Sequence, residues 1–250
     1  MFPPELNEEE LKTLVISAYK KLKDSFAEFQ TPDGDKNTPA KTCRDLFVAH
    51  PEKPSGEYWI DPNGADPRDS ILVYCDAGSK STCISSKPEI SEELTMKYEP
   101  TKEVSLFFRL IFGGQFIFYL QVWLSESKSA RHIINYKADK NQMSFMQLLS
   151  QKADQKLTLH CRNTIATKDA RGNQKKAVSL MSWNDLEYKH KGKFQYEVVK
   201  DECGGEDWAE AVLRINTDRP TRLPVVDLKL ADFGSKNQAI KVEVGQVCFS

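Results

Sequence analysis

Three carboxylates and one amide fall within nine residues of one short stretch, and together they could bind a metal ion: Asp61, Asn63, Asp66 and Asp69. Residues that break regular structure lie among them, namely Pro62, Gly64 and Pro67. Calcium takes six to eight side-chain and main-chain oxygens at flexible angles, which an irregular acidic loop can supply. We therefore expect a calcium site, although a solvated turn rich in Asp, Asn, Pro and Gly has the same composition.

The loop does not follow the EF-hand pattern. Counting from Asp61, an EF-hand requires Gly at the sixth position and Glu at the twelfth, where this chain has Asp66 and Leu72. Two aromatic residues, Tyr58 and Trp59, precede the loop. An alternating apolar run that predicts a strand follows it, at Ile71, Val73 and Cys75. We expect the acidic loop to be held between this aromatic pair and the strand.

Six cysteines are spread along the chain: Cys43, Cys75, Cys83, Cys161, Cys203 and Cys248. None forms a CxxC pair and no histidine lies at ligand spacing from one, which argues against a zinc site. An even count fits three disulfides and an oxidising compartment, and the alternative is six buried thiols in a cytosolic protein. Spacing alone does not choose among the many pairings that six cysteines allow.

Motifs of catalytic and nucleotide-binding sites are missing, including the P-loop, the nucleophile elbow, HExxH and the Gly-rich dinucleotide fingerprint. We interpret the four scattered histidines as surface or hydrogen-bonded core residues: His50, His132, His160 and His190. The acidic loop has no evident base beside it, which disfavours a hydrolase that uses paired carboxylates. We expect no enzymatic activity, and the net charge of −1 argues against nucleic-acid binding.

Residues 5–30 form the most helical stretch, with charged residues filling the gaps and no Gly or Pro. Apolar side chains recur at spacings of three and four along it: Leu11, Val15, Ala18, Leu22, Phe26 and Phe29. These six residues form a narrow apolar stripe along the helix, called the seam below. A stripe this narrow fits a short coiled coil, and the alternative is an amphipathic helix lying on its own domain. An isolated helix of this length is marginal in water and needs a partner surface. We predict a helical stalk and linker over 1–36 and a globular domain over 37–250.

The remainder of the chain predicts an α+β domain with an antiparallel or mixed sheet. The apolar run 104–124 is interrupted by polar residues and a Gly pair, so we predict two core strands instead of a membrane helix. Met143 to Ala153 has the spacing of a core-facing helix whose methionines pack, and the small, polar stretch 76–88 predicts a turn. Alternation predicts further strands at 157–161, 194–199, 211–215, 225–230 and 240–247.

Several segments, in order along the chain, resemble the C-terminal propeptide of fibrillar collagens. They are TPDGDKNTPAKTCRDL (31–46), SGEYWIDPN (55–63), LHCRNTIA (159–166), GNQKKA (172–177), TRLPVVDL (221–228) and VGQVCF (244–249). The match covers most of 31–250 and is weakest across 84–150, where only FGGQFIFY is similar.

The resemblance implies a trimerisation domain of a fibrillar procollagen, which associates three chains, sets their register and nucleates the triple helix. It implies a coiled-coil-like stalk followed by a fibrinogen-like, disulfide-stapled globular domain. The partners would be two further collagen chains, in a homotrimer, and a procollagen C-proteinase. The protein would fold in the endoplasmic reticulum lumen and be secreted to the extracellular matrix.

The family's motif also assigns roles to individual residues. Calcium would take side-chain oxygens from Asp61, Asn63 and Asp69 and main-chain carbonyls from Gly64 and Asp66, at a subunit interface. The intrachain disulfides of the family map to Cys43–Cys75, Cys83–Cys248 and Cys161–Cys203, and each would contribute roughly 2–5 kcal/mol.

Two cysteines that commonly link neighbouring chains in the family are replaced here, by Ala49 and Asp66. We therefore expect a trimer without disulfides between subunits. The alternative function is a secreted, fibrinogen-like recognition domain that uses the calcium loop or a nearby pocket to bind a glycan or an acetylated ligand.

Overall fold

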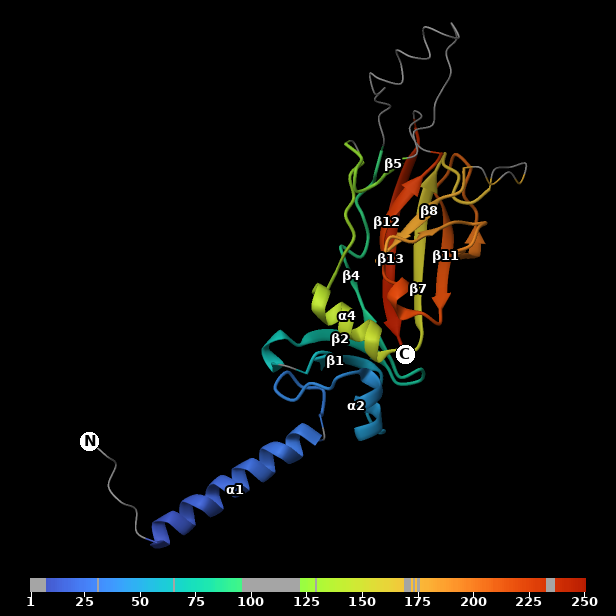
Figure 1. The fold of residues 1–250 in the computed structure, drawn as a ribbon. Helices are drawn as coiled ribbons and strands as arrows, with labels where there is room; N and C mark the ends of the chain where they lie inside the picture. The colour runs from blue at the N-terminus through green and yellow to red at the C-terminus, as the bar shows by residue number, and fades with distance from the viewer. Residues whose placement is uncertain are drawn as a thin grey trace, which may run out of the picture. The chain divides into compact units, whose positions relative to one another are not determined.

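The computed structural model describes residues 8–30, 32–64, 66–95, 122–128, 130–168, 172, 174, 176–232 and 237–250. The chain divides into two compact units, residues 1–82 and residues 83–250. Figure 1 shows the elements of both. The sequence pattern gives no sign of a division at this point, and the predicted boundary between a stalk ending at 36 and a globular domain stays a prediction.

The first unit contains two helices and an antiparallel hairpin (Figure 1). Its elements are α1 (Glu8–Gln30), α2 (Cys43–Ala49), β1 (Gly56–Ile60), a 3-10 turn (Pro67–Asp69) and β2 (Ile71–Asp76). The hydroxyl of Thr42 accepts a hydrogen bond from the backbone N–H of Asp45 and so caps α2 at its start. The strand predicted after the acidic loop is confirmed.

The second unit is built on a sheet in which four strands lie in the order β13-β7-β11-β10, each antiparallel to its neighbour. Their bounds are β7 (Ala153–Arg162), β10 (Glu197–Asp201), β11 (Ala209–Thr217) and β13 (Ala239–Phe249). Alternate residues of β7 are buried, as expected for a sheet with one face in the core. The antiparallel α+β fold expected from the sequence is therefore confirmed.

A second, four-stranded sheet covers the buried face of the first. Its strands, in the order β5-β12-β8-β9, are β5 (Val122–Trp123), β12 (Val225–Leu230), β8 (Ser179–Ser182) and β9 (Glu187–Tyr188). Gln155 on β7 is fully buried, and its Oε1 accepts a hydrogen bond of 2.9 Å from the backbone N–H of Val225 on β12. Its Nε2 donates to the hydroxyl of Tyr136, so this buried amide is satisfied and joins the two layers.

The helix α4 (Lys140–Leu149) is capped at its start by Asp139, whose carboxylate accepts from the backbone N–H groups of residues 141 and 142. Met143 and Met146 are fully buried, which confirms that they pack in the core. The predicted helix is too long, because Ala153 belongs to β7. The backbone N–H groups of residues 151 and 152 donate to the carbonyl of Ser250 instead of continuing the helix.

Two other predictions need correction. The stretch 76–88 contains the strands β3 (Ser81–Ile84) and β4 (Ser86–Lys87), and β4 pairs with β6 (Asn135–Tyr136). All four residues of β3 are buried, so no alternation marks this strand in the sequence. The strand predicted at 194–199 begins only at Glu197.

The apolar run 104–124 lies outside the described residues except for its last three, of which Val122 and Trp123 form β5. In the described part of the chain, none of the helices combines the length and the hydrophobicity that a membrane span requires.

Three disulfides join residues distant in sequence: Cys43–Cys75 in the first unit, and Cys83–Cys248 and Cys161–Cys203 in the second. These are the pairings that the resemblance implies. The bridge from β3 to β13 closes the longest loop, with a sequence separation of 165 residues. Longer loops lose more entropy in the unfolded chain when they are closed, so this bridge is expected to stabilise the second unit most.

Candidate functional site

The acidic loop joins β1 to β2. Ile60, the last residue of β1, pairs with Ile71, the first residue of β2. At the start of the loop the backbone N–H of Asp61 donates to the carbonyl of Ala40, at 2.8 Å. The Asp61 side chain is buried, and its Oδ1 accepts from the backbone N–H of Gly64 at 3.2 Å. Gly64 has a φ of +62°, which favours glycine and lets the chain turn back towards this carboxylate.

The other loop side chains form two separate contacts. The amide Nδ2 of Asn63 donates to Oδ2 of Asp69 at 2.9 Å, which brings two of the predicted ligands together. The carboxylate of Asp66 instead accepts from the backbone N–H and the guanidinium of Arg68. These hydrogen bonds from Arg68 lower the pKa of Asp66 to about 2. Because the Asp66 side chain is engaged by Arg68, its carbonyl is the part of the residue better suited to an ion, as the resemblance implies.

Within the described residues, no three side chains of the types His, Cys, Asp and Glu cluster as a metal site. A calcium site of the predicted kind would have a mixed ligand set, with two carboxylates, one amide and main-chain carbonyls. The donor types present in the loop fit such a site. Hydrogen bonds bring Asn63 to Asp69 and Gly64 to Asp61.

Covalent and aromatic contacts fix the hairpin that carries the loop. Cys43 on α2 and Cys75 on β2 are fully buried and disulfide-bonded. The rings of Phe47 and Tyr58 meet edge to face, with centroids 6.2 Å apart. The backbone N–H of Trp59 donates to the carbonyl of Gly34, at 2.8 Å, which ties the linker to β1. These contacts position the acidic loop from both sides.

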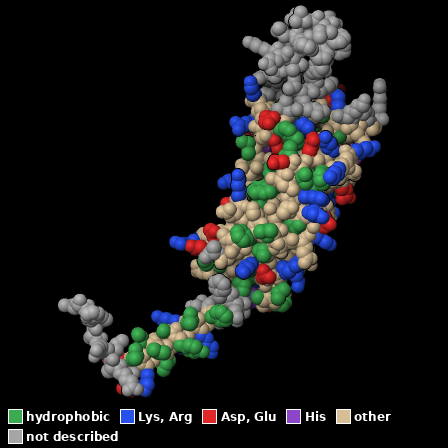
Figure 2. Space-filling view, viewed as in Figure 1, with side chains coloured by type: hydrophobic (Ala, Val, Ile, Leu, Met, Phe, Trp, Pro, Cys, Tyr) green, Lys and Arg blue, Asp and Glu red, His purple; other side chains and the backbone are tan. Residues whose placement is uncertain are grey.

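The second candidate region is α1. Its predicted seam residues Leu11, Val15, Ala18, Leu22 and Phe26 are all exposed, as are Leu14, Ile16 and Tyr19. Figure 2 shows the apolar side chains along this helix. The side chain of Phe29 lies outside the described residues. An apolar helix face that the chain leaves in water is a surface that a partner can cover.

A cavity that no sequence pattern predicts is lined by Glu187, Lys189, His190, Lys191 and Lys229 among others. The nearest signal in the sequence is the basic run Lys189-His190-Lys191 followed by Lys193. Lys229 lies far from this run in the sequence, and only the pairing of β12 with β8 brings it close.

The fold and these sites define a disulfide-bonded α+β domain with an acidic loop and an exposed apolar helix. The family model of the fibrillar collagen C-terminal domain matches residues 11–249. The chain therefore belongs to the fibrillar collagen C-terminal domain family. The matched range includes most of α1 and the stretch 84–150, where the motifs alone are weakest.

Curated collagen chains are similar over almost the whole sequence. The chain is 37% identical over 260 residues to a collagen alpha-2(I) chain of Oryctolagus cuniculus, covering 99% of this chain and 46% of that protein. It is 36% identical to a collagen alpha-2(I) chain of Oncorhynchus mykiss and to a collagen alpha-1(II) chain of Xenopus tropicalis, over 241 residues in each case. These two alignments cover 94% of this chain but 17% and 16% of the relatives.

Proposed function

We propose that this chain is a fibrillar procollagen C-propeptide that associates three chains, sets their register and nucleates the triple helix. The observation that carries the proposal is the family match over residues 11–249. Three chains joined at one end have a high effective concentration, which turns the slow encounter of three strands into an intramolecular step. The partners are two further collagen chains, in a homotrimer. The role is structural and requires no catalytic residue.

The helix α1 is the stalk in this proposal. Its described seam side chains, Leu11, Val15, Ala18, Leu22 and Phe26, are exposed in the single chain, and three copies packed along the seam would bury them in a short coiled coil. Burial of apolar surface contributes about 25 cal/mol per Å², so even a short seam adds substantially to association. The globular part that follows is proposed to be fibrinogen-like.

Calcium in the acidic loop is the second part of the proposal. Side-chain oxygens of Asp61, Asn63 and Asp69 and carbonyls of Gly64 and Asp66 would hold the ion. Repulsion between the carboxylates of Asp61 and Asp69 would be offset by the bound cation, which would order the loop at a subunit interface. Depletion of calcium is then expected to loosen the trimer.

The trimer is proposed to form without disulfides between subunits. All six cysteines pair within the chain and none is free. Ala49, at the end of α2, and Asp66 stand where relatives carry chain-linking cysteines. A gel run in SDS without reductant is expected to show only the monomer, and a disulfide-linked trimer band would contradict the proposal.

Three intrachain disulfides fit folding in the oxidising endoplasmic reticulum lumen, followed by secretion to the extracellular matrix. A procollagen C-proteinase is the proposed processing partner. No observation favours the alternative of a recognition domain that binds a glycan or an acetylated ligand at the calcium loop.

A fusion of Gly-Pro-Pro repeats to the N-terminus tests nucleation. The fused segment is expected to form a triple helix at concentrations where the free peptide stays unfolded, because the three strands are tethered at one end. Circular dichroism melting and resistance to pepsin report the triple helix. Identical melting of the fused and the free segment would contradict the proposal.

A further inference from the structure

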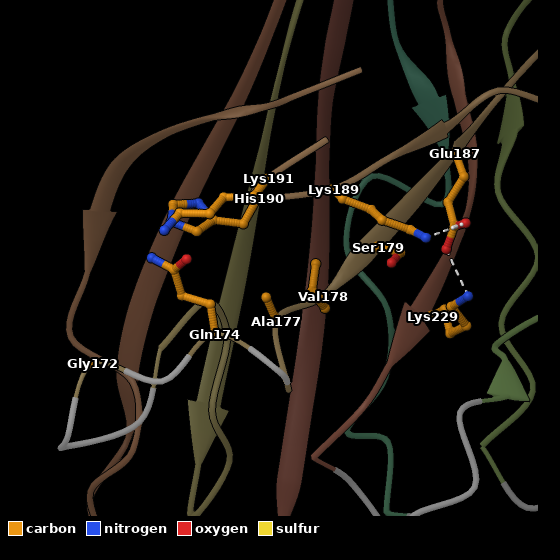
Figure 3. Close-up of a pocket in the computed structure, with 10 residues that line it drawn as sticks. All are labelled: Gly172, Gln174, Ala177, Val178, Ser179, Glu187, Lys189, His190, Lys191 and Lys229. Carbon is orange, nitrogen blue, oxygen red and sulfur yellow. Dashed lines mark ion pairs between the residues drawn. The ribbon is translucent and has the colours of Figure 1, made fainter. Parts of the chain in front are cut away.

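The second unit contains a cavity of about 530 Å³ beside the strands β8 and β9. Its walls include Gly172, Gln174, Ala177, Val178, Ser179, Glu187, Lys189, His190, Lys191 and, on β12, Lys229 (Figure 3). Polar and cationic groups dominate its lining, and the described lining residues include no Phe, Tyr or Trp. A cavity of this size is within the range of small-molecule sites, and its lining suits a hydrated, polar ligand.

One carboxylate and three ammonium groups line the described part of the cavity. Glu187 pairs with Lys229 at 2.6 Å and with Lys189 at 3.0 Å, as the dashed lines in Figure 3 mark. Burial raises the pKa of Glu187, but the hydrogen bonds from Lys229 and Lys189 outweigh it and leave the pKa at about 2. Glu187 is therefore ionised at neutral pH, and the cavity keeps an excess of positive charge.

Part of the excess charge, the ammonium group of Lys191, lies at the end of the cavity away from Glu187 (Figure 3). There Figure 3 shows Lys191 and His190 close to Gln174. In the part of the chain that the structure describes, Lys191 has no ion-pair partner. The Nδ1 atom of His190 is buried and has no hydrogen-bond partner among the same residues. A buried polar atom without a partner is costly, and a ligand that bonds to it would remove that cost.

The chemistry of the donors selects the class of ligand. Planar carboxylates are matched best by the fork of an arginine, and none of the described residues that line the cavity is an arginine. Lysine acts as a point charge with rotatable donors and suits a tetrahedral oxyanion. The cavity exceeds the size of a bare oxyanion, and the side chains of Ser179 and Gln174 can bond to hydroxyl groups.

We propose that this cavity binds a sugar that carries a sulfate or phosphate ester. Lys191 and His190 hold the ester oxygens, and Gln174 and Ser179 contact the hydroxyl groups of the ring. Glu187 holds Lys189 and Lys229 in place and contributes no ligand contact. The site is separate from the acidic loop and from α1, so it does not depend on the proposed assembly function.

Calorimetric titration of the folded chain tests the proposal with three probes: a heparin-derived sulfated disaccharide, its desulfated parent and glucose 6-phosphate. We expect at least one of the two charged sugars to bind and the uncharged sugar not to bind. The charged sugar that binds identifies the source of the ester. Binding is expected to weaken as salt rises, because an ion contact in an open cavity is screened.

The variant Lys191→Gln removes one ammonium group from the cavity, and Lys193→Gln is its matched control. Lys193 lies two residues further on, over the ring of Phe194, and does not line the cavity. Lys191→Gln is expected to weaken binding about fivefold, the size of one such ion contact, and Lys193→Gln to leave it unchanged. Equal thermal melting of both variants and the parent chain excludes unfolding as the cause.

Three results would overturn the proposal. They are the absence of binding by both charged sugars, equal binding of the uncharged sugar, and equal losses of affinity in the two lysine variants. The mass of Lys191→Gln in solution is expected to match the parent's, so failure of this proposal is distinguishable from failure of the assembly function.

Discussion

Asp61 is the loop carboxylate that folding removes most fully from water, with 4% of the residue exposed, whereas Asp69 stays exposed. An ionised carboxylate is costly to bury unless opposite charge or hydrogen bonds compensate it. The backbone N–H of Gly64 supplies part of that compensation, and a calcium ion bound to the loop would add to it. This makes Asp61 the predicted ligand whose removal tells most about the site.

We expect Asp61→Asn to lower calcium affinity roughly tenfold or more, because one charge and one strong ligand are lost. Asp35→Asn, an exposed carboxylate of the same unit, is the control and is expected to have no effect. Calorimetric titration with calcium measures both variants. Equal affinities of Asp61→Asn and the parent chain would remove this residue from the ligand set.

Glu187 gives a prediction about pH. Its pKa is about 2 in the folded chain, below the ordinary value of 4.5, so the folded state favours the ionised form. The stability from its ion pairs is fully present above pH 4.5 and is lost as pH falls towards 2.

Glu187→Gln is therefore expected to destabilise the chain by roughly 1–3 kcal/mol at pH 7. The difference in unfolding free energy from the parent is expected to shrink as pH falls below 4.5. Urea unfolding at several pH values measures it, with the exposed Glu57→Gln as the control. A difference that does not change with pH would mean that the ion pairs do not stabilise the fold.

At the scale of elements, exposed residues of α1 allow the proposed association to be tested without disturbing the fold of the single chain. Leu22 and Ile16 are similarly exposed, at 71% and 67%, so neither supports the fold of the single chain. Leu22 belongs to the predicted seam. Ile16 directly follows the seam residue Val15 and points about 100° around the helix from it.

We predict that Leu22→Asp weakens trimer formation strongly, since it would place three carboxylates in the seam, while Ile16→Asp has a much smaller effect. Sedimentation velocity over a range of concentrations measures both variants, and circular dichroism checks their folding. Equal effects of the two substitutions would show that the predicted seam is not the association face.

Gly245 shows how closely two strands of the second unit approach. It lies on β13 where the register with β7 shifts, between Val244 and Val247. A Cβ atom at this position would lie 2.6 Å from the carbonyl oxygen of Lys156 on β7. Only glycine fits such a contact without movement of the backbone.

Gly245→Ala is expected to lower stability by roughly 1–3 kcal/mol, which lowers the Tm by about 2–4 °C for each kcal/mol. Gly205→Ala is the matched control, because no atom lies within 4 Å of its added Cβ. Thermal melting of both variants measures the effect. A Tm for Gly245→Ala equal to that of the control would contradict the close approach.

Sequence patterns predicted the elements whose burial follows a period. The strands around Leu157, Leu213 and Val242 alternate, and the methionines of α4 keep helical spacing, so one buried face is visible in each. The strand β3 is buried at all four positions and consists of small and polar residues, so it has no periodic signal.

The two sites differ in the same respect, because one has a signal in the sequence and the other does not. The acidic loop is visible in the sequence because its residues are neighbours along the chain. The cavity is not, because Lys229 joins Glu187 and Lys191 only through strand pairing in the second sheet. Cysteine pairing is a similar case: spacing left it open, and a family resemblance supplied the pairs that the fold contains.

At the scale of the whole molecule, the central claim is that this chain is a module for association. The chain spans less than half of the length of the curated collagen chains that it matches, 46% of one and 17% of another. It leaves apolar residues of α1 in water, and all of its cysteines are paired internally. We therefore predict that association rests on packing and on the acidic loop, without covalent links.

The mass of the chain in solution, measured by sedimentation equilibrium with calcium and with a chelator, tests this claim most directly. The account predicts a trimer in calcium, with no covalent link between subunits, and a weaker association after calcium is removed. A monomer in both conditions, even at high protein concentration, would contradict the claim.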